Sequence, residues 1–211
     1  MQLHDTTSTL RLGTPLGRAR AAIILLHGRG SAAEEIAGLS SVFTAPGLAF
    51  LAPNATHHTW YPNRFLAPLP QNEPWLGSAL AVIDQLVNEV RAAGIPFDHI
   101  GLAGFSQGAC LALDYAARNP RRYGFVAGLS GALIGPLDTP RPPIDLQGTP
   151  VLLGCAERDA HIPLDHVEAS VRTLTAAKAA VTRQIYPGSA HTVFPPEIAW
   201  LASQFQVERP S

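Results

Sequence analysis

The residues with the clearest chemical potential lie in the stretch GLAGFSQGACLALD, residues 101–114, where Ser106 stands between Gly104 and Gly108. A serine in a G-x-S-x-G pattern can occupy a sharp strand-to-helix turn that strains its backbone and exposes its hydroxyl. An apolar run precedes Ser106, and a helical pattern follows from about Gln107. The pattern predicts a nucleophilic serine, with an ordinary glycine-rich turn as the alternative.

A nucleophilic serine needs a general base, and the base needs an acid that orients it. Two downstream residues follow strand-like runs in the chain order Ser, Asp, His. Asp159 comes after the run at 150–154, and His191 comes after the run at 183–186. The carboxyl ends of parallel strands are where sites assemble in open α/β sheets. We therefore expect Asp159 and His191 to serve Ser106.

Four other residues compete for these roles. Glu157 stands two residues before Asp159, and Asp165 falls in the first turn of a predicted helix. His161 and His166 follow the serine but leave no strand between acid and base. We expect none of the four to replace the acid and base named above.

A second glycine-rich turn, HGRG at residues 27–30, follows the apolar run 21–26. Such a turn can supply a backbone N–H to an oxyanion, paired with the N–H of the residue after the nucleophile. We expect the main-chain N–H groups of Arg29 and Gln107 to form this oxyanion hole. A plain strand-exit turn is the alternative.

Short apolar runs alternate with helical patterns along the chain. Runs that are apolar on both faces are typical of a buried parallel sheet. The runs cover residues 21–26, 48–52, 99–103, 125–129, 150–154 and, more weakly, 183–186. The helical patterns cover residues 75–93, 107–119, 164–180 and 196–205. This alternation predicts an α/β fold in one domain, residues 1–211, with a mostly parallel central sheet flanked by helices on both faces.

Two segments lack either pattern. Residues 56–74 are long, aromatic and broken by proline, and a loop of this length is usually functional or mobile. We interpret them as a partial flap over the site. Residues 131–149 are rich in proline and glycine and too short to fold into a covering lid.

Composition excludes several classes of function. The 211 residues include 15 basic and 16 acidic side chains, a net charge of -1, so no electrostatic footprint for nucleic acid is present. The apolar run 21–26 is too short for a signal peptide or a membrane span, so we expect a cytoplasmic protein. The expected partner is a small-molecule substrate. The oligomeric state is left open, with a homodimer as one option.

No cofactor or metal is expected. His57 and His58 are adjacent and cannot both face one ion if the chain is extended, and neither H-E-x-x-H nor a paired C-x-x-C is present. Cys110 and Cys155 each lie in an apolar stretch and are interpreted as two buried free thiols, with one disulfide as the alternative.

Six motifs together resemble the phospholipase/carboxylesterase family of α/β-hydrolases, which includes bacterial carboxylesterases and acyl-protein thioesterases. They are LLHGRG (25–30), TWY (59–61), GFSQG (104–108), GLSG (128–131), D-x-x-I-P (159–163) and GSAH (188–191). The resemblance implies a serine hydrolase with Ser106, Asp159 and His191 as its triad. It also implies that the N–H groups of Arg29 and Gln107 form the oxyanion hole.

The resemblance further implies that Trp60 and Tyr61 line the acyl or alcohol pocket, with core packing as the alternative. Two positions depart from the family pattern: Arg29 stands where many members have Leu, and Cys155-Ala156 stands where many have His-Gly. A cation at the mouth of the site argues against a long neutral acyl substrate. We expect a carboxylesterase; the alternatives are an acyl-thioesterase, a lysophospholipase, or a binding protein on the same scaffold.

Overall fold

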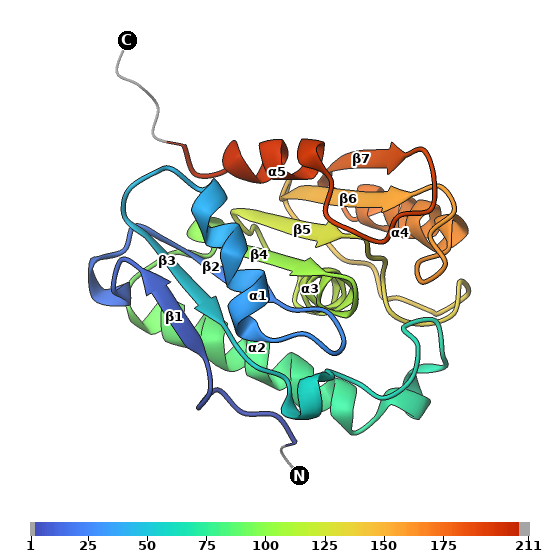
Figure 1. Ribbon diagram of the computed structural model, residues 1–211, viewed down its shortest axis with the longest axis horizontal. Helices are drawn as coiled ribbons and strands as arrows, with labels where there is room; N and C mark the ends of the chain where they lie inside the picture. The colour runs from blue at the N-terminus through green and yellow to red at the C-terminus, as the bar shows by residue number, and fades with distance from the viewer. Residues whose placement is uncertain (1–2, 207–211) are drawn as a thin grey trace.

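The computed structural model describes residues 3–206, and its centre is one seven-stranded sheet (Figure 1). The strands lie in the order β1-β3-β2-β4-β5-β6-β7, and every neighbouring pair is parallel except β1 with β3. Their bounds are Leu10–Gly13, Ala21–Leu26, Leu48–Ala52, Ile100–Phe105, Phe125–Leu129, Pro150–Ala156 and Ala180–Tyr186, for β1 to β7. The predicted fold class is confirmed.

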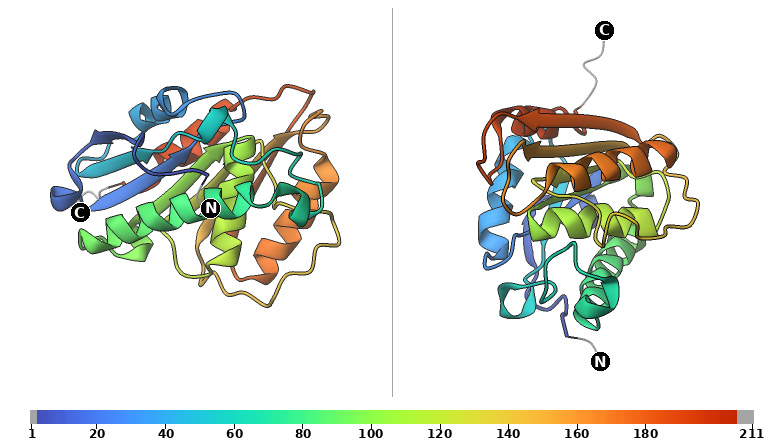
Figure 2. Two further views of the ribbon diagram at one scale, coloured as in Figure 1. Left: turned by 90° about the horizontal axis from the view of Figure 1, so that it is seen from below. Right: turned by 90° about the vertical axis from the view of Figure 1, so that its right-hand side faces the viewer.

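Within residues 3–206, five α-helices cover the sheet on both faces (Figure 2). Their bounds are Ala33–Ala37, Trp75–Ala92, Gln107–Arg118, Leu164–Ala176 and Pro195–Ala202, for α1 to α5. Alternate residues of β2 belong to two separate cores: Ile23 is part of the core that includes residues of α1 and α5, whereas Ile24 is part of the core that includes residues of α2, α3 and α4. Both faces of β2 are fully buried, which is why its sequence is a continuous apolar run.

Two elements and one helix end differ most from the sequence prediction. β1 was not expected, because an edge strand with exposed polar residues carries a weak apolar signal. The five-residue α1 is too short for a helical period to be recognised. The helix expected over 164–180 ends at Ala176, and Lys178 takes a positive φ of 57° before β7 begins at Ala180. A turn of this kind requires a residue in the left-handed conformation. Glycine or asparagine usually marks that position, but here it is a lysine.

Two glycines allow α3 to lie close against the sheet. A Cβ at Gly104 would meet the carbonyl carbon and oxygen of Gly108 at 2.3 Å. A Cβ at Gly108 would meet the carbonyl oxygen of Leu26 at 2.1 Å. Real Cβ atoms do not approach backbone so closely, so both positions need glycine. The spacing of G-x-S-x-G therefore sets how closely α3 approaches β4 and β2.

The two irregular segments also have defined positions. Residues 56–74 contain two short 3-10 helices, Thr56–His58 and Leu69–Asn72. The structure describes all of residues 131–149, and they contain no helix or strand. Arg141 anchors this second segment, because its Nη1 lies 2.8 Å from the buried carboxylate of Asp114 on α3.

None of the helices in residues 3–206 has the length and the apolar character needed to cross a bilayer.

Candidate functional site

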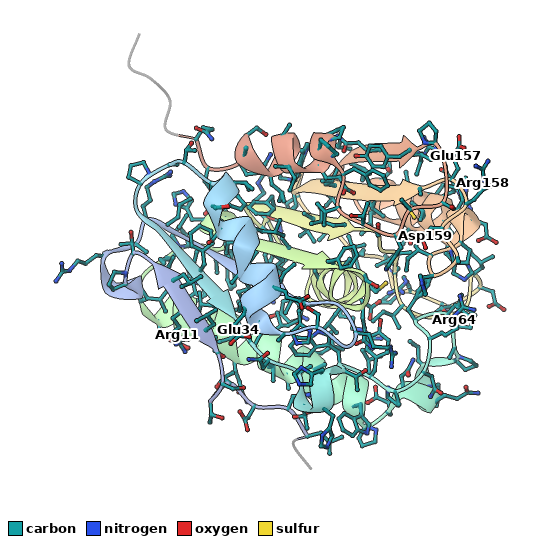
Figure 3. All side chains as sticks on the ribbon, viewed as in Figure 1. Arg11, Glu34, Arg64, Glu157, Arg158 and Asp159 are labelled. Atoms are coloured by element: carbon teal, nitrogen blue, oxygen red, sulfur yellow. The ribbon has the colours of Figure 1, made fainter. Side chains whose placement is uncertain are left out.

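The candidate residues gather at one edge of the sheet, where the parallel strands end. Ser106 follows β4, Asp159 follows β6, and His191 follows β7. Figure 3 shows Asp159 at the end of the molecule toward which the arrows of β4 to β7 point. This edge is the usual position of a site in an open α/β sheet.

Ser106 occupies a strained turn between β4 and α3. Its φ is 54° and its ψ is -115°, a backbone conformation that L-residues rarely adopt. The turn is held at both sides, because the N–H of Ser106 donates to the carbonyl of Leu129 at 2.9 Å and its own carbonyl accepts from Cys110 N–H at 3.0 Å. The turn raises the side chain out of the sheet edge while the backbone stays fixed, as a nucleophile elbow does.

Hydrogen bonds join Ser106, His191 and Asp159 in a chain. The Oγ of Ser106 lies 2.8 Å from Nε2 of His191. The Nδ1 of the same imidazole lies 2.7 Å from Oδ2 of Asp159. Since a carboxylate only accepts, Nδ1 carries the proton in the neutral ring, and Nε2 accepts the serine hydroxyl proton. This tautomer is the one that a general base for Ser106 needs.

The carboxylate of Asp159 is buried and yet remains ionised. Burial by itself raises the pKa of a carboxyl group, but four interactions with His191, His161 and Ile162 outweigh it, and the pKa of Asp159 falls below its usual value. Its Oδ1 accepts the backbone N–H groups of His161 at 2.8 Å and Ile162 at 3.1 Å. Its Oδ2 accepts from His191 at 2.7 Å and, over a longer distance of 3.7 Å, from the thiol of Cys155.

The four alternative acid and base residues do not bond to Ser106. Glu157 and Asp165 are exposed, and Asp165 stands in the first turn of α4. His166 Nδ1 lies 3.0 Å from Asp165, and its ring packs edge-on against Phe65. The His161 ring packs 4.7 Å from the His191 ring, centroid to centroid, and is therefore near the site without bonding to Ser106.

The HGRG turn lies beside Ser106. In-register pairing of β2 with β4 places Leu26 opposite Gly104, and the space next to Gly28 is bounded by Phe105 and the Cβ of Ser106. The N–H of Gly30 donates to the carbonyl of His58 at 2.7 Å. Within residues 3–206, the N–H groups of Arg29 and Gln107 have no hydrogen-bond acceptor.

His27 fixes the base of this turn. Its Nε2 accepts the N–H of Ala55 at 3.0 Å, so its Nδ1 carries the proton and donates to the carbonyl of Gly28 at 2.7 Å. Burial lowers the pKa of His27, which keeps the ring neutral. A fully buried imidazole thus ties the HGRG turn to the start of the irregular segment 56–74.

A cleft of about 570 Å³ opens over Ser106 and His191. Residues 61–65 form one wall of it, whereas none of its lining residues in the described chain comes from 131–149. Tyr61 lines the cleft. Trp60 is fully buried and is absent from the lining over residues 3–206; its indole N–H donates to the carbonyl of His27 at 2.9 Å. Both side chains are therefore buried in the core, and of the two only Tyr61 also borders the cleft among the residues described.

The side chains of Arg29 and Gln107 both hold the 59–63 segment. Arg29 donates to Thr59 Oγ1 and to the carbonyls of residues 61, 62 and 63, at 2.6 to 3.0 Å. Gln107 accepts the N–H of Trp60 at 3.0 Å and donates to the carbonyl of Tyr61 at 2.8 Å. The guanidinium of Arg29, which the sequence analysis expected at the mouth of the site, thus holds the 59–63 segment in place.

Cys110 lies beneath Ser106 and is unsuited to nucleophilic attack. Both cysteines are free and buried. Burial raises the pKa of Cys110 to about 12, so its thiol stays protonated at neutral pH. Over residues 3–206, no group of three or more His, Cys, Asp or Glu side chains is arranged to hold a metal ion.

Sequence reasoning missed Ser130. This fully buried residue follows β5 with a positive φ of 52°, and its hydroxyl donates to the carbonyl of Thr192 at 2.9 Å. Its motif GLSG was visible in the sequence, but the sequence offered no signal that the hydroxyl contacts the residue after His191.

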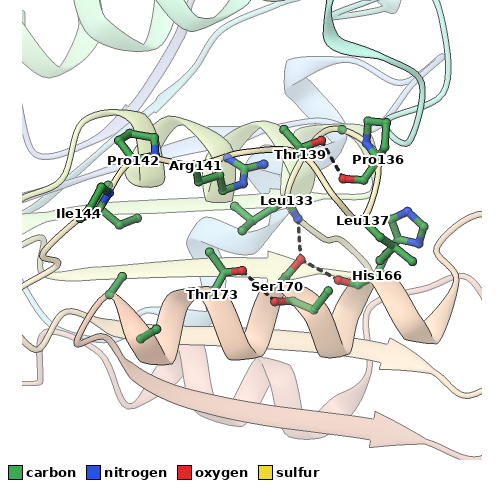
Figure 4. Close-up of a pocket in the computed structure, with 15 residues that line it drawn as sticks. Leu133, Pro136, Leu137, Thr139, Arg141, Pro142, Ile144, His166, Ser170 and Thr173 are labelled. Carbon is green, nitrogen blue, oxygen red and sulfur yellow. Dashed lines mark hydrogen bonds between the residues drawn. The ribbon is translucent and has the colours of Figure 1, made fainter.

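A second cavity, of about 520 Å³, lies between the segment 131–149 and α4 (Figure 4). Its polar groups are already paired: Leu133 N–H donates to Ser170 Oγ, which donates in turn to the carbonyl of His166. It shares no lining residue with the cleft among the residues described, so the two are separate hollows.

Comparison with known proteins identifies relatives over nearly the whole chain. A family model described as Phospholipase/Carboxylesterase matches residues 11–206. The acyl-protein thioesterase 1 of Eremothecium gossypii is 25% identical over 238 residues, covering 98% of this chain and 97% of that protein. The protein NocK of Nocardia uniformis subsp. tsuyamanensis is 32% identical over 161 residues, 72% of this chain. That match covers only 44% of NocK.

A crystal structure of a phospholipase/carboxylesterase from Dyadobacter fermentans is similar throughout. Its TM-score is 0.90 at 40% sequence identity, and the superposition covers 96% of this chain and 97% of that one.

Proposed function

This chain belongs to the phospholipase/carboxylesterase family of hydrolases, and on that premise we propose that it cleaves carboxylic esters through Ser106, His191 and Asp159. The observation that supports the proposal most directly is the hydrogen-bonded chain from Ser106 Oγ through the imidazole to Asp159, at 2.8 and 2.7 Å. A serine hydroxyl alone is a weak nucleophile, and this chain supplies the base that activates it.

In the first half of the reaction, Ser106 Oγ attacks the acyl carbonyl carbon while its proton passes to Nε2 of His191. The imidazolium that forms is stabilised by the ionised Asp159, which also fixes the ring in its productive tautomer. When the tetrahedral intermediate collapses, the bond to the leaving-group oxygen breaks, and His191 returns its proton to that oxygen. The products are the free alcohol and an acyl group on Ser106.

In the second half, water repeats the sequence. His191 accepts a proton from water, the hydroxide adds to the acyl carbon, and the bond to Ser106 Oγ breaks as His191 returns the proton to it. The carboxylic acid leaves, and the enzyme is restored with no change in its own charge.

In both tetrahedral intermediates, the carbonyl oxygen becomes negative. We assign the N–H groups of Arg29 and Gln107 to that charge, because both lie beside Ser106 without an acceptor among residues 3–206. Gln107 is the first residue of α3, so its N–H also sits at the positive end of the helix dipole. Donors fixed before the reaction are worth several kcal/mol to the transition state, roughly 3 to 4 for one donor.

A thioester is the second candidate substrate. The relative from Eremothecium gossypii is named an acyl-protein thioesterase and aligns over nearly the full length of both chains. The same steps would cleave a thioester, with sulfur as the leaving atom. The cleft favours short acyl groups in both cases, because within the described chain the segment 131–149 contributes no covering residue to it.

The decisive experiment compares wild type with Ser106→Ala on p-nitrophenyl esters and on thioesters of graded acyl length. We expect a loss of roughly 10⁴-fold or more in kcat/KM with an unchanged circular dichroism spectrum. Ser203→Ala is the matched control, because its hydroxyl donates to a helix carbonyl, that of Trp200, outside the cleft. Retained hydrolysis in Ser106→Ala, or no labelling of Ser106 by a fluorophosphonate, would contradict the proposal.

A further inference from the structure

The charges that line the cleft are not balanced. Two guanidinium groups, those of Arg29 and Arg64, and one carboxylate, that of Glu35, line it within residues 3–206. Neither arginine forms an ion pair with an acidic side chain in the described chain. The ionised Asp159 lies behind His191 and offsets this difference, so a preference for an anionic substrate has to come from an individual guanidinium group.

Arg29 is poorly placed to bind that substrate itself. Its two terminal nitrogens already make four hydrogen bonds to Thr59 and to the carbonyls of residues 61–63. These nitrogens carry four of the five N–H groups, so only the single Nε–H is left for a ligand. Its role is to hold the wall of the cleft.

The guanidinium of Arg64 makes fewer and longer hydrogen bonds than that of Arg29. Only its Nη2 is bonded, and weakly, to the carbonyls of Ala160 at 3.4 Å and His161 at 3.3 Å. Its Nε and Nη1 have no acceptor among residues 3–206. The Nε–H and Nη1–H groups lie on different edges of the guanidinium, and each remains as a charge-assisted donor for an anionic group.

The contacts of Arg64 place it on the leaving-group side of the site. Its two acceptors belong to the loop that carries Asp159, and the ring of His161 packs 4.7 Å from that of His191. Figure 3 shows Arg64 and Asp159 at the same end of the molecule. In ester hydrolysis His191 must protonate the leaving-group oxygen, so the leaving group lies toward His191. The oxyanion turn, with Arg29 and Glu35, contributes other parts of the lining.

On the basis of the proposed ester hydrolysis, we propose that Arg64 selects substrates whose leaving group carries a carboxylate. The substrate class is then an ester of a hydroxy acid, cleaved to a short carboxylic acid and the free hydroxy acid. Arg64 touches the substrate away from the reacting bond and is a specificity residue.

The experiment uses a matched pair of acetyl esters. They are 4-acetoxybenzoate, with a carboxylate on the leaving group, and its methyl ester, which is neutral. The ratio of their kcat/KM values is measured in wild type, Arg64→Gln and Arg64→Lys. Because intrinsic reactivity and any general disturbance of the Ala160–His161 loop affect both esters, comparing ratios between variants isolates recognition of the charge.

We expect Arg64→Gln to lower the ratio about fivefold to tenfold, as for the loss of a partly solvated charge-assisted hydrogen bond. Arg64→Lys retains part of the preference. Arg172→Gln, which removes a charge from an exposed position on α4, leaves the ratio unchanged. The preference also weakens with added sodium chloride, because the site is open to solvent.

A second pair tests the assigned side: the p-nitrophenyl monoester of adipic acid against p-nitrophenyl hexanoate. If Arg64→Gln lowers this ratio and leaves the first one unchanged, the anion lies on the acyl side and the proposal is wrong. It is equally wrong if neither ratio changes while hydrolysis still depends on Ser106. Should both esters of the first pair be cleaved as fast by Ser106→Ala, the proposed function itself fails.

Discussion

The hydroxyl of Ser130, at the end of β5, lies 2.9 Å from the carbonyl oxygen of Thr192 and donates a hydrogen bond to it. Thr192 directly follows His191, so a buried side chain from the middle of the sheet fixes the loop that carries the imidazole. The N–H of Ser130 in turn donates to the carbonyl of Gly154 on β6 at 2.9 Å. The position of His191 thus depends on a strand other than its own.

We predict that Ser130→Ala lowers kcat roughly five- to fiftyfold with little change in KM. The lost bond is worth about 1 kcal/mol, and the imidazole it helps to position is needed in the transition state. Steady-state kinetics on a neutral p-nitrophenyl ester would measure the effect. Ser203→Ala, which also removes a serine-to-carbonyl bond, should be unchanged. A purely structural role for Ser130 would lower stability without this loss of kcat.

The strained backbone of Ser106 predicts a difference between two inactive variants. At φ 54° and ψ -115°, alanine retains the strain, whereas glycine relieves it. We expect Ser106→Gly to be about 1 kcal/mol more stable to urea than Ser106→Ala. Equal midpoints for the two variants would mean that the turn stores no strain.

The close approach of α3 to the sheet predicts that Gly104→Ala is strongly destabilising. The new Cβ would lie 2.3 Å from the backbone of Gly108, and we expect a loss of about 3 kcal/mol or more in the free energy of unfolding. Gly38→Ala is the control, because Gly38 has helical φ and ψ and no atom within 4 Å of the added Cβ. Thermal or urea unfolding of both variants gives the comparison.

Because the carboxyl group of Glu197 is buried, we expect the free energy of unfolding to depend on pH. Burial raises its pKa from 4.5 to about 7, and only one of its oxygens is bonded, to the N–H of Phe194 at 2.7 Å. The folded protein therefore holds a proton that the unfolded chain releases above pH 4.5. Glu197 therefore contributes its full share to the free energy of unfolding below pH 4.5. That contribution declines as the pH rises to about 7, by roughly 3 kcal/mol in all.

Urea midpoints at several pH values between 4.5 and 8 would measure this decline. We expect Glu197→Gln to have a flatter profile than wild type, since it cannot ionise, and to be the more stable of the two at pH 8. If the urea midpoint of Glu197→Gln falls with pH as steeply as that of wild type, the pH dependence comes from another group.

The sequence determined the features that depend on local pattern. Continuous apolar runs identified the buried parallel strands, and helical periodicity identified four of the helices, because these signals repeat within a few residues. G-x-S-x-G between a strand and a helix predicted the turn at Ser106. The chain order predicted which acid and base residues to consider.

Tertiary structure decided the rest, because it depends on which distant residues meet. The sequence could not show which of Trp60 and Tyr61 borders the cleft, since both are adjacent aromatics. Nor could it show that four acceptors in the loop hold Arg29 while Nε and Nη1 of Arg64 have no acceptor in the described chain. The hydrogen bond from Ser130 spans 62 residues. Contacts at such separations are fixed by the packing of the whole sheet, and no local pattern encodes them.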